Sequence, residues 1–138
     1  MAELPIGPGG IVAETEHWIV DHTFGSLGVG TLIVKPKRTV LHVGDLNADE
    51  ASELGPLLRR AARVVQELTA ADQVYVCLWS HAERQPGHIH FVIQPVTREL
   101  MAEHDAHGPA LQVALFTRGE PPDDAAATAF AAAARARW

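Results

Sequence analysis

The chain has 138 residues, of which 47% are hydrophobic, and a formal net charge of −6 at neutral pH. This length fits one domain with a real core, and the negative charge argues against binding to a nucleic acid polymer. No apolar run reaches the ~20 residues of a membrane span, and the start of the chain lacks the features of a secretory signal. Cys77 is the only cysteine, which excludes an intrachain disulfide. We therefore expect a cytoplasmic protein that neither enters a membrane nor binds nucleic acid polymers.

The first third of the chain alternates predicted strands with glycine-rich turns. Residues 1–10 are expected to form a flexible lead-in, followed by a single domain over residues 11–138. Residues 11–14, 17–21 and 31–34 have the apolar patterns of short strands. The glycines of residues 25–30 open a strand rather than a helix, which favours a hairpin turn over a dinucleotide-binding loop.

A long helix is predicted next. Asn47 and Glu50 have the spacing of a helix N-cap with a reciprocal glutamate. Apolar residues then recur at helical spacing from Leu54 to Leu68. Pro56 is expected to kink this helix or to mark its true beginning.

The second half of the chain contains two more predicted strands and a helical C-terminal part. Residues 73–79 are rich in β-branched and aromatic side chains, as strands are. Residues 97–106 and 109–116 are expected to be helical, although residues 111–116 also fit a strand. The alanine-rich residues 125–136 predict a terminal helix with acidic residues at its start. The order of strands, helix, strands and helices indicates an α+β fold with an antiparallel sheet.

The segment GHIHFVIQPV at residues 87–96 is the most informative stretch of the sequence. On an extended strand the even-numbered residues 88–94 share one face, while the odd-numbered residues 89–93 share the other. The odd-numbered face is apolar and suits a core. The even-numbered face begins with His88 and His90, and paired imidazoles on one face suggest a ligand, a metal or chemistry.

Three interpretations of the paired histidines remain open from the residues alone. Both imidazoles can be hydrogen-bonded and inert. They can also be two ligands of one metal ion, with His81, Cys77 or a distant acid completing the set. Finally, one neutral imidazole can attack phosphorus near neutral pH, because its unperturbed pKa is about 6.5. In that case the backbone around Gly87 can approach a phosphate closely.

The same segment resembles the motif of the histidine-triad (HIT) superfamily, in which three histidines alternate with apolar residues. Residues 88–95 match this motif, except that Val92 holds the third histidine position. Residues 31–38 resemble the strand and basic turn that precede the family's helix, and residues 45–50 resemble its start. The resemblance is closest to small bacterial diadenosine-polyphosphate hydrolases. It implies a five-stranded antiparallel sheet with one long helix and C-terminal helices, usually assembled as a homodimer.

The resemblance also implies roles for individual residues. His90 holds the position of the family's nucleophile, and His88 that of the residue that orients it. Asp21 lies where the family contacts the ribose hydroxyls, with Trp18 and Ile19 at the border of the base. The loop before the histidines departs from the family, in which a glutamine and a small hydroxyl residue contact the phosphates. From their proximity in sequence, we expect Arg84 to supply positive charge and His81 to replace a missing imidazole, with Gln85 and Gly87 also at the nucleotide.

These residues together predict a nucleotide-phosphate hydrolase or nucleotidyl transferase, which forms a covalent nucleotidyl-histidine on His90. The substrate is expected to be a dinucleoside polyphosphate or a nucleoside phosphoramidate. We assign no metal ligands and no cofactor to the covalent step, and expect a divalent cation only with a polyphosphate. Val92 and Thr31 stand where relatives have further histidines, so the alternative is a nucleotide-binding protein without catalysis.

Overall fold

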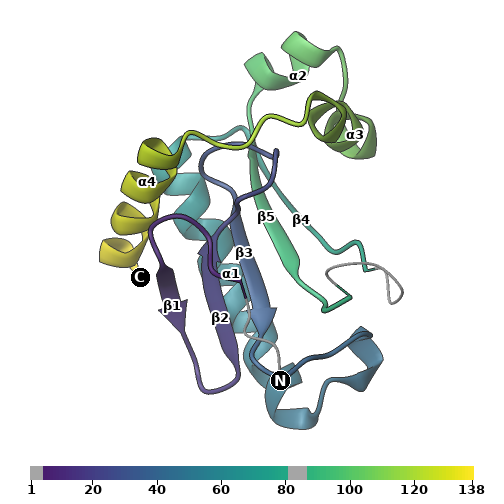
Figure 1. Cartoon of the computed structure of the whole chain (residues 1–138), viewed down its shortest axis with the longest axis vertical. Coiled ribbons are helices and arrows are strands. Elements are labelled where there is room, and N and C mark those ends of the chain that lie inside the picture. Colours follow the sequence, from purple (N-terminus) through teal and green to yellow (C-terminus); the bar gives the residue numbers. More distant parts are fainter. Residues whose placement is uncertain (1–4, 81–86) are drawn as a thin grey trace.

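Five antiparallel strands form one sheet with the order β1-β2-β3-β5-β4 (Figure 1). The computed structural model describes residues 5–80 and 87–138. The strands are β1 (Ile11–Glu14), β2 (Trp18–His22), β3 (Leu32–Pro36), β4 (Gln73–Cys77) and β5 (Phe91–Val96). The helices of these residues are the 3-10 helix η1 (Val43–Asp45) and the α-helices α1 (Ala48–Thr69), α2 (Arg98–His104), α3 (Gly108–Arg118) and α4 (Asp124–Arg137). The predicted α+β class and its five-stranded antiparallel sheet are confirmed.

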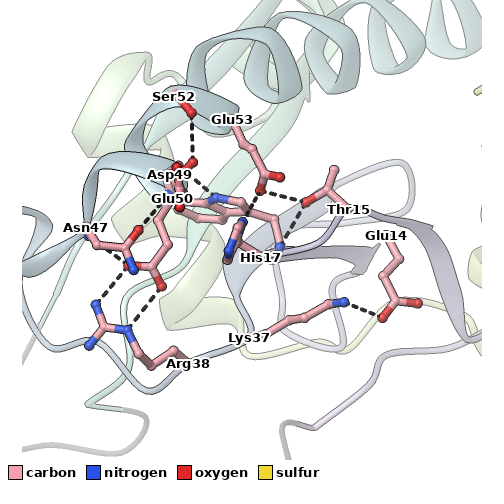
Figure 2. A network of polar contacts seen from close by, with 11 residues as sticks. Glu14, Thr15, His17, Lys37, Arg38, Asn47, Asp49, Glu50, Ser52 and Glu53 are labelled. Atoms are coloured by element: carbon pink, nitrogen blue, oxygen red, sulfur yellow. Dashed lines mark hydrogen bonds and ion pairs between the residues drawn. The ribbon is translucent and has the colours of Figure 1, made fainter.

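Helix α1 begins at the predicted cap. The Asn47 side chain accepts a hydrogen bond from the Glu50 amide at 2.8 Å, and Glu50 Oε1 accepts one from the Asn47 amide at 2.8 Å. Arg38 donates to both oxygens of the Glu50 carboxylate at 3.1 and 2.8 Å (Figure 2). Pro56 lies within this helix, so the prediction that it marks the true beginning is wrong. The hydrogen bonds at the cap start the helix upstream, and a proline removes only one backbone donor.

Helices α1 and α4 cover one face of the sheet. Their buried residues form a cluster with the apolar side chains of β2, β3 and β5, with the fully buried Trp18 among them. The alanines of α4 allow a close approach, and Ala131 and Ala134 are fully buried in this cluster. The main core therefore lies on one side of the sheet only.

Helices α2 and α3 cover part of the opposite face. Leu111 and Leu115 of α3 pack against Val92 and Val96 of β5, and Figure 1 shows both helices at the upper end of β4 and β5. Residues 111–116 are thus helical, which resolves the ambiguity of the sequence pattern. The rest of this face is left for a cavity.

The paired histidines precede strand β5, which begins at Phe91. The prediction that His88 and His90 lie within the strand is therefore wrong. The Ile89 amide donates to the Val40 carbonyl at 2.8 Å, outside the ladder between β3 and β5. The alternation of faces nevertheless continues through this segment, because Ile89 is fully buried while both histidines line the cavity described below. Within the described residues, no helix is both long and apolar enough to cross a membrane.

Candidate active site

A cavity of about 210 Å³ lies on the face of the sheet opposite α1. Strands β2, β3 and β5 form its floor, α3 contributes to one wall, and the N-terminal segment and the β2–β3 loop complete it. Most of the lining is apolar, with a few convergent polar groups, as is usual for small-molecule sites. The lining residues are Pro5, Asp21, Thr23, Phe24, Gly25, Leu27, Ile33, Lys35, His88, His90, Val92 and Phe116.

His88 is held by two backbone hydrogen bonds. Its Nε2 lies 2.8 Å from the Pro36 carbonyl oxygen, and its Nδ1 accepts from the Val40 amide at 3.1 Å. A carbonyl can only accept, so these partners fix the neutral tautomer with the proton on Nε2. Burial lowers the pKa of His88 against the opposing effect of the hydrogen bond to Pro36, and the nearby His90 and Lys35 lower it further. Both ring nitrogens are occupied, so His88 itself is no nucleophile in this geometry.

His90 has the complementary arrangement. Its Nδ1 lies 3.2 Å from the carbonyl oxygen of His88, which can only accept a hydrogen bond. The proton of a neutral His90 therefore resides on Nδ1, and the lone pair resides on Nε2. Since His90 lines the cavity, this tautomer provides a nucleophilic nitrogen at the site.

A buried ion pair lies under the same cavity. Lys35 Nζ is 3.0 Å from Asp21 Oδ2, which also accepts from the Gly7 amide at 2.8 Å. Lys35 donates in addition to the Pro5 carbonyl, so residues 5–10, expected to be a loose lead-in, contact the site directly. Burial raises the pKa of Asp21, against the opposing effect of Lys35. Among the described residues, Asp21 Oδ1 is buried without a hydrogen-bond partner.

Two residues assigned to the base by resemblance do not line the cavity. Trp18 is fully buried on the opposite face, where its indole nitrogen donates to the Glu50 carbonyl at 3.0 Å. Ile19 pairs with Lys35 in the sheet but is not among the lining residues. Trp18 and Asp21 are three apart on one strand, and period-two alternation puts them on opposite faces.

The remaining predicted residues fall into three groups. Gly87 directly precedes His88 but is not among the lining residues. His81, Arg84 and Gln85 lie outside the described residues. Cys77, considered above as a metal ligand, lines a different pocket. Its sulfur is 3.0 Å from the side-chain amide nitrogen of Gln112.

The two departures from the histidine motif leave no ring nitrogen at their positions. Val92 lines the cavity with an apolar side chain, and Thr31 is fully buried with its hydroxyl donating to the Leu27 carbonyl at 3.3 Å. Neither side chain replaces a histidine as a proton donor in this arrangement. Any third polar group at the site must therefore come from elsewhere.

Several lining residues were missed by sequence reasoning. Lys35 alternates with apolar neighbours on β3, so strand alternation could have predicted that its side chain shares a face with Asp21. Phe24 and Phe116 come from a loop and from α3, and both are large exposed aromatics, at 58% and 54%. No local pattern joins these two distant positions.

The fold and cavity define an α+β protein whose candidate site lies on the side of the sheet opposite its long helix. Searches with family models and against curated proteins found no match. Among solved structures, the NitFhit protein of C. elegans superimposes with a TM-score of 0.70 at 18% identity, over 93% of this chain and 27% of that one. A HIT-like protein of Bartonella henselae involved in cell-cycle regulation gives 0.69 at 18% identity, over 98% and 88%.

A third structure is the diadenosine triphosphate hydrolase of Plasmodium falciparum, with a TM-score of 0.59 at 16% identity, over 64% of this chain and 61% of that one. This chain therefore has the fold of the histidine-triad proteins, and its resemblance to that superfamily is confirmed at the level of the fold. The chain spans little more than a quarter of the NitFhit protein.

The lowered pKa of the half-buried His88 predicts a dependence of stability on pH. Its folded pKa lies below the unfolded value of about 6.5, so the unfolded chain binds more protons between these two values. The free energy of unfolding should therefore be fully retained above about pH 6.5 and fall as the pH drops toward the folded pKa. Denaturant unfolding from pH 7.5 to 5 measures this slope.

His88→Gln should reduce this slope without removing it, because the pKa of the buried His22 is also lowered. Substitution of the exposed His42 by glutamine should leave the slope unchanged. An equal slope in the His88→Gln variant and the wild type would contradict the lowered pKa of His88.

Proposed function

We propose that this chain is a nucleotide-phosphate hydrolase or nucleotidyl transferase that acts at an α-phosphate through His90. The main support is the hydrogen bond from His90 Nδ1 to the His88 carbonyl, which leaves the Nε2 lone pair at a cavity. The fold adds support, because one structure that shares it is a diadenosine triphosphate hydrolase. The expected substrates are dinucleoside polyphosphates and nucleoside phosphoramidates.

The chemistry follows from the two histidines. His90 Nε2 attacks the α-phosphorus, and the bond from phosphorus to the leaving oxygen or nitrogen breaks with its electron pair. A leaving nitrogen takes a proton from water as it departs as an amine. The nucleotidyl-imidazole is positively charged, and the His88 carbonyl stabilises it by accepting from Nδ1–H. Water or another acceptor then attacks phosphorus and loses its proton to the solvent, and the electron pair of the N–P bond returns to Nε2. His88 acts as a positioning residue, since its ring is bonded to the backbone on both sides.

The nucleoside is proposed to occupy the apolar part of the cavity. The unpartnered Asp21 Oδ1 suits a ribose hydroxyl, as the resemblance implies, and Lys35 keeps this carboxylate paired. For the base, Phe24 and Phe116 replace Trp18 and Ile19 in our proposal, because they line the cavity and expose aromatic surface. The phosphate contacts assigned to His81, Arg84, Gln85 and Gly87 remain part of the proposal.

The alternative is a protein that binds a nucleotide without cleaving it. Val92 and Thr31 favour this alternative, because neither provides an imidazole near the phosphate. Losing one transition-state donor typically costs about 10²–10³ in rate, so a slow enzyme and a non-catalytic binder differ by degree. A covalent nucleotidyl group on His90 after incubation with substrate would distinguish a slow enzyme from a protein that only binds the nucleotide.

His90→Ala should abolish turnover and the covalent intermediate while the fold is retained, because this side chain lies at the cavity and outside the main core. Intact-protein mass spectrometry after brief incubation without acid should show an added nucleotidyl mass on the wild type only. A nucleoside phosphoramidate in the presence of chelator tests the same step without a metal. The exposed His42→Ala serves as a matched control and should behave as the wild type.

Two outcomes would decide against this mechanism. An active His90→Ala protein would exclude His90 as the nucleophile. Nucleotide binding by the wild type without adduct or product, across both substrate classes, would favour the non-catalytic alternative.

Phe116→Ala should raise KM for nucleotide substrates about tenfold, with a smaller change in kcat, because stacking of a base on an aromatic ring is worth ~1–3 kcal/mol. Val113→Ala is the matched control, since Val113 is on the same helix and highly exposed but does not line the cavity. Steady-state kinetics with both variants measures the split. An unchanged KM in Phe116→Ala would remove this residue from the base site.

A homodimer is also proposed, as the resemblance implies. Strand β4 is an edge of the sheet, and unpaired strand edges are templates for pairing with another chain. Its Val76 is 44% exposed, so a partner strand would cover apolar surface. Sedimentation equilibrium should give twice the chain mass for the wild type and a lower mass for Val76→Lys, and a monomeric wild type would contradict the dimer.

A further inference from the structure

A second group of potential ligand atoms lies away from the cavity, where the turn between β1 and β2 meets α1. Glu16 and His17 come from the turn, and Glu53 comes from the second turn of α1. One carboxylate oxygen from each glutamate and one ring nitrogen of His17 lie within 4.8 Å of one another. Two separate elements thus bring three donors together.

The His17 ring nitrogen has an unusual position. Nδ1 lies 3.2 Å from Glu53 Oε2, yet among the described residues this buried atom has no hydrogen-bond partner. The oxygen therefore lies off the direction in which an Nδ1–H group would donate. Two atoms that share a tetrahedral zinc ion are about 3.3 Å apart, given metal–ligand distances of about 2.0–2.1 Å. The separation of this pair fits two ligands of one ion.

The local charges also suit a cation. Lys37 pairs with Glu14 at 2.8 Å, and Arg38 pairs with Glu50 at 2.8 Å (Figure 2). In the part of the chain that the structure describes, no lysine or arginine forms an ion pair with Glu16 or Glu53. Two carboxylates beside a single imidazole therefore keep a net negative charge.

The carboxylate of Glu53 is also oriented. The Thr15 hydroxyl donates to Glu53 Oε2 at 3.0 Å and accepts from the Trp18 amide at 2.9 Å. Figure 2 shows Thr15 and His17 approaching Glu53 from the same turn. Outer hydrogen bonds of this kind hold metal-ligating carboxylates in place.

We propose that Glu16, His17 and Glu53 bind a divalent transition-metal ion, with Zn²⁺ as the probe. One imidazole nitrogen and two carboxylate oxygens provide three ligands, and water provides the fourth. The imidazole favours zinc over magnesium and calcium, which prefer oxygen ligands only. The ion joins the β1–β2 turn to α1, so its binding stabilises the folded chain.

The test is a Zn²⁺ titration of the full chain after removal of metals with a chelator and dialysis. Calorimetry should give one zinc site per chain. Zn²⁺ should also raise the melting temperature, whereas Mg²⁺ at the same concentration should not. His17→Gln and Glu53→Gln should each weaken zinc binding at least about tenfold, since even a change in an outer partner costs that much. Both substitutions should also remove the zinc-dependent rise in melting temperature.

Matched controls separate this site from other zinc-binding groups. Glu14→Gln makes the same charge change next to the same turn, but Glu14 is paired with Lys37, so zinc binding should be unchanged. His90→Ala should also retain it, because the cavity is a different site. If circular dichroism shows that His17→Gln does not fold, the zinc affinity of Glu53→Gln tests the proposed site instead. Retained zinc affinity in Glu53→Gln, no zinc-dependent melting shift in the wild type, or an equal shift with Mg²⁺ would overturn the proposal.

Discussion

The geometry of the candidate active site depends on the two hydrogen bonds of the His88 ring. They connect the segment before β5 to the Pro36 carbonyl at the end of β3 and to the Val40 amide beyond it. With the ring fixed, the backbone of His88 is fixed too, and its carbonyl sets the tautomer of His90. Main-chain atoms, rather than an acidic side chain, therefore determine which His90 nitrogen carries the lone pair. Such preorganised dipoles need no rearrangement during a reaction.

A second constraint comes from the Asp21–Lys35 pair. Burying two charges is costly unless they are paired and hydrogen-bonded, and here the N-terminal segment supplies the additional bonds through Pro5 and Gly7. A Cβ atom on Gly7 would lie 1.7 Å from the His22 carbonyl oxygen, so only glycine fits at this approach. The polar end of the cavity thus depends on a segment that the sequence pattern marks only as a loop.

Strand alternation and helix capping allowed much of this fold to be predicted. The Asn47 cap and the faces of β5 follow from local rules, because neighbouring residues alone determine them. The start of β5 could not be predicted, since the hydrogen bond of Ile89 to Val40 depends on a distant loop. For Trp18, strand alternation predicts the correct face of the sheet, whereas the resemblance to the family does not. A side chain three residues from Asp21 on a strand lies on the other face. The position of Phe116 in the cavity wall could not be predicted, because it depends on the packing of α3 on β5, which no short-range pattern encodes.

The position of Pro5 in the cavity wall has a practical consequence for handling the protein. A substitution or a cut in the backbone within residues 5–7 would alter this wall and the groups that hold Asp21 and Lys35. Helix α4 lies next to β1, on the other face of the sheet, so its exposed residues are attachment positions for immobilising the protein with the cavity left open (Figure 1).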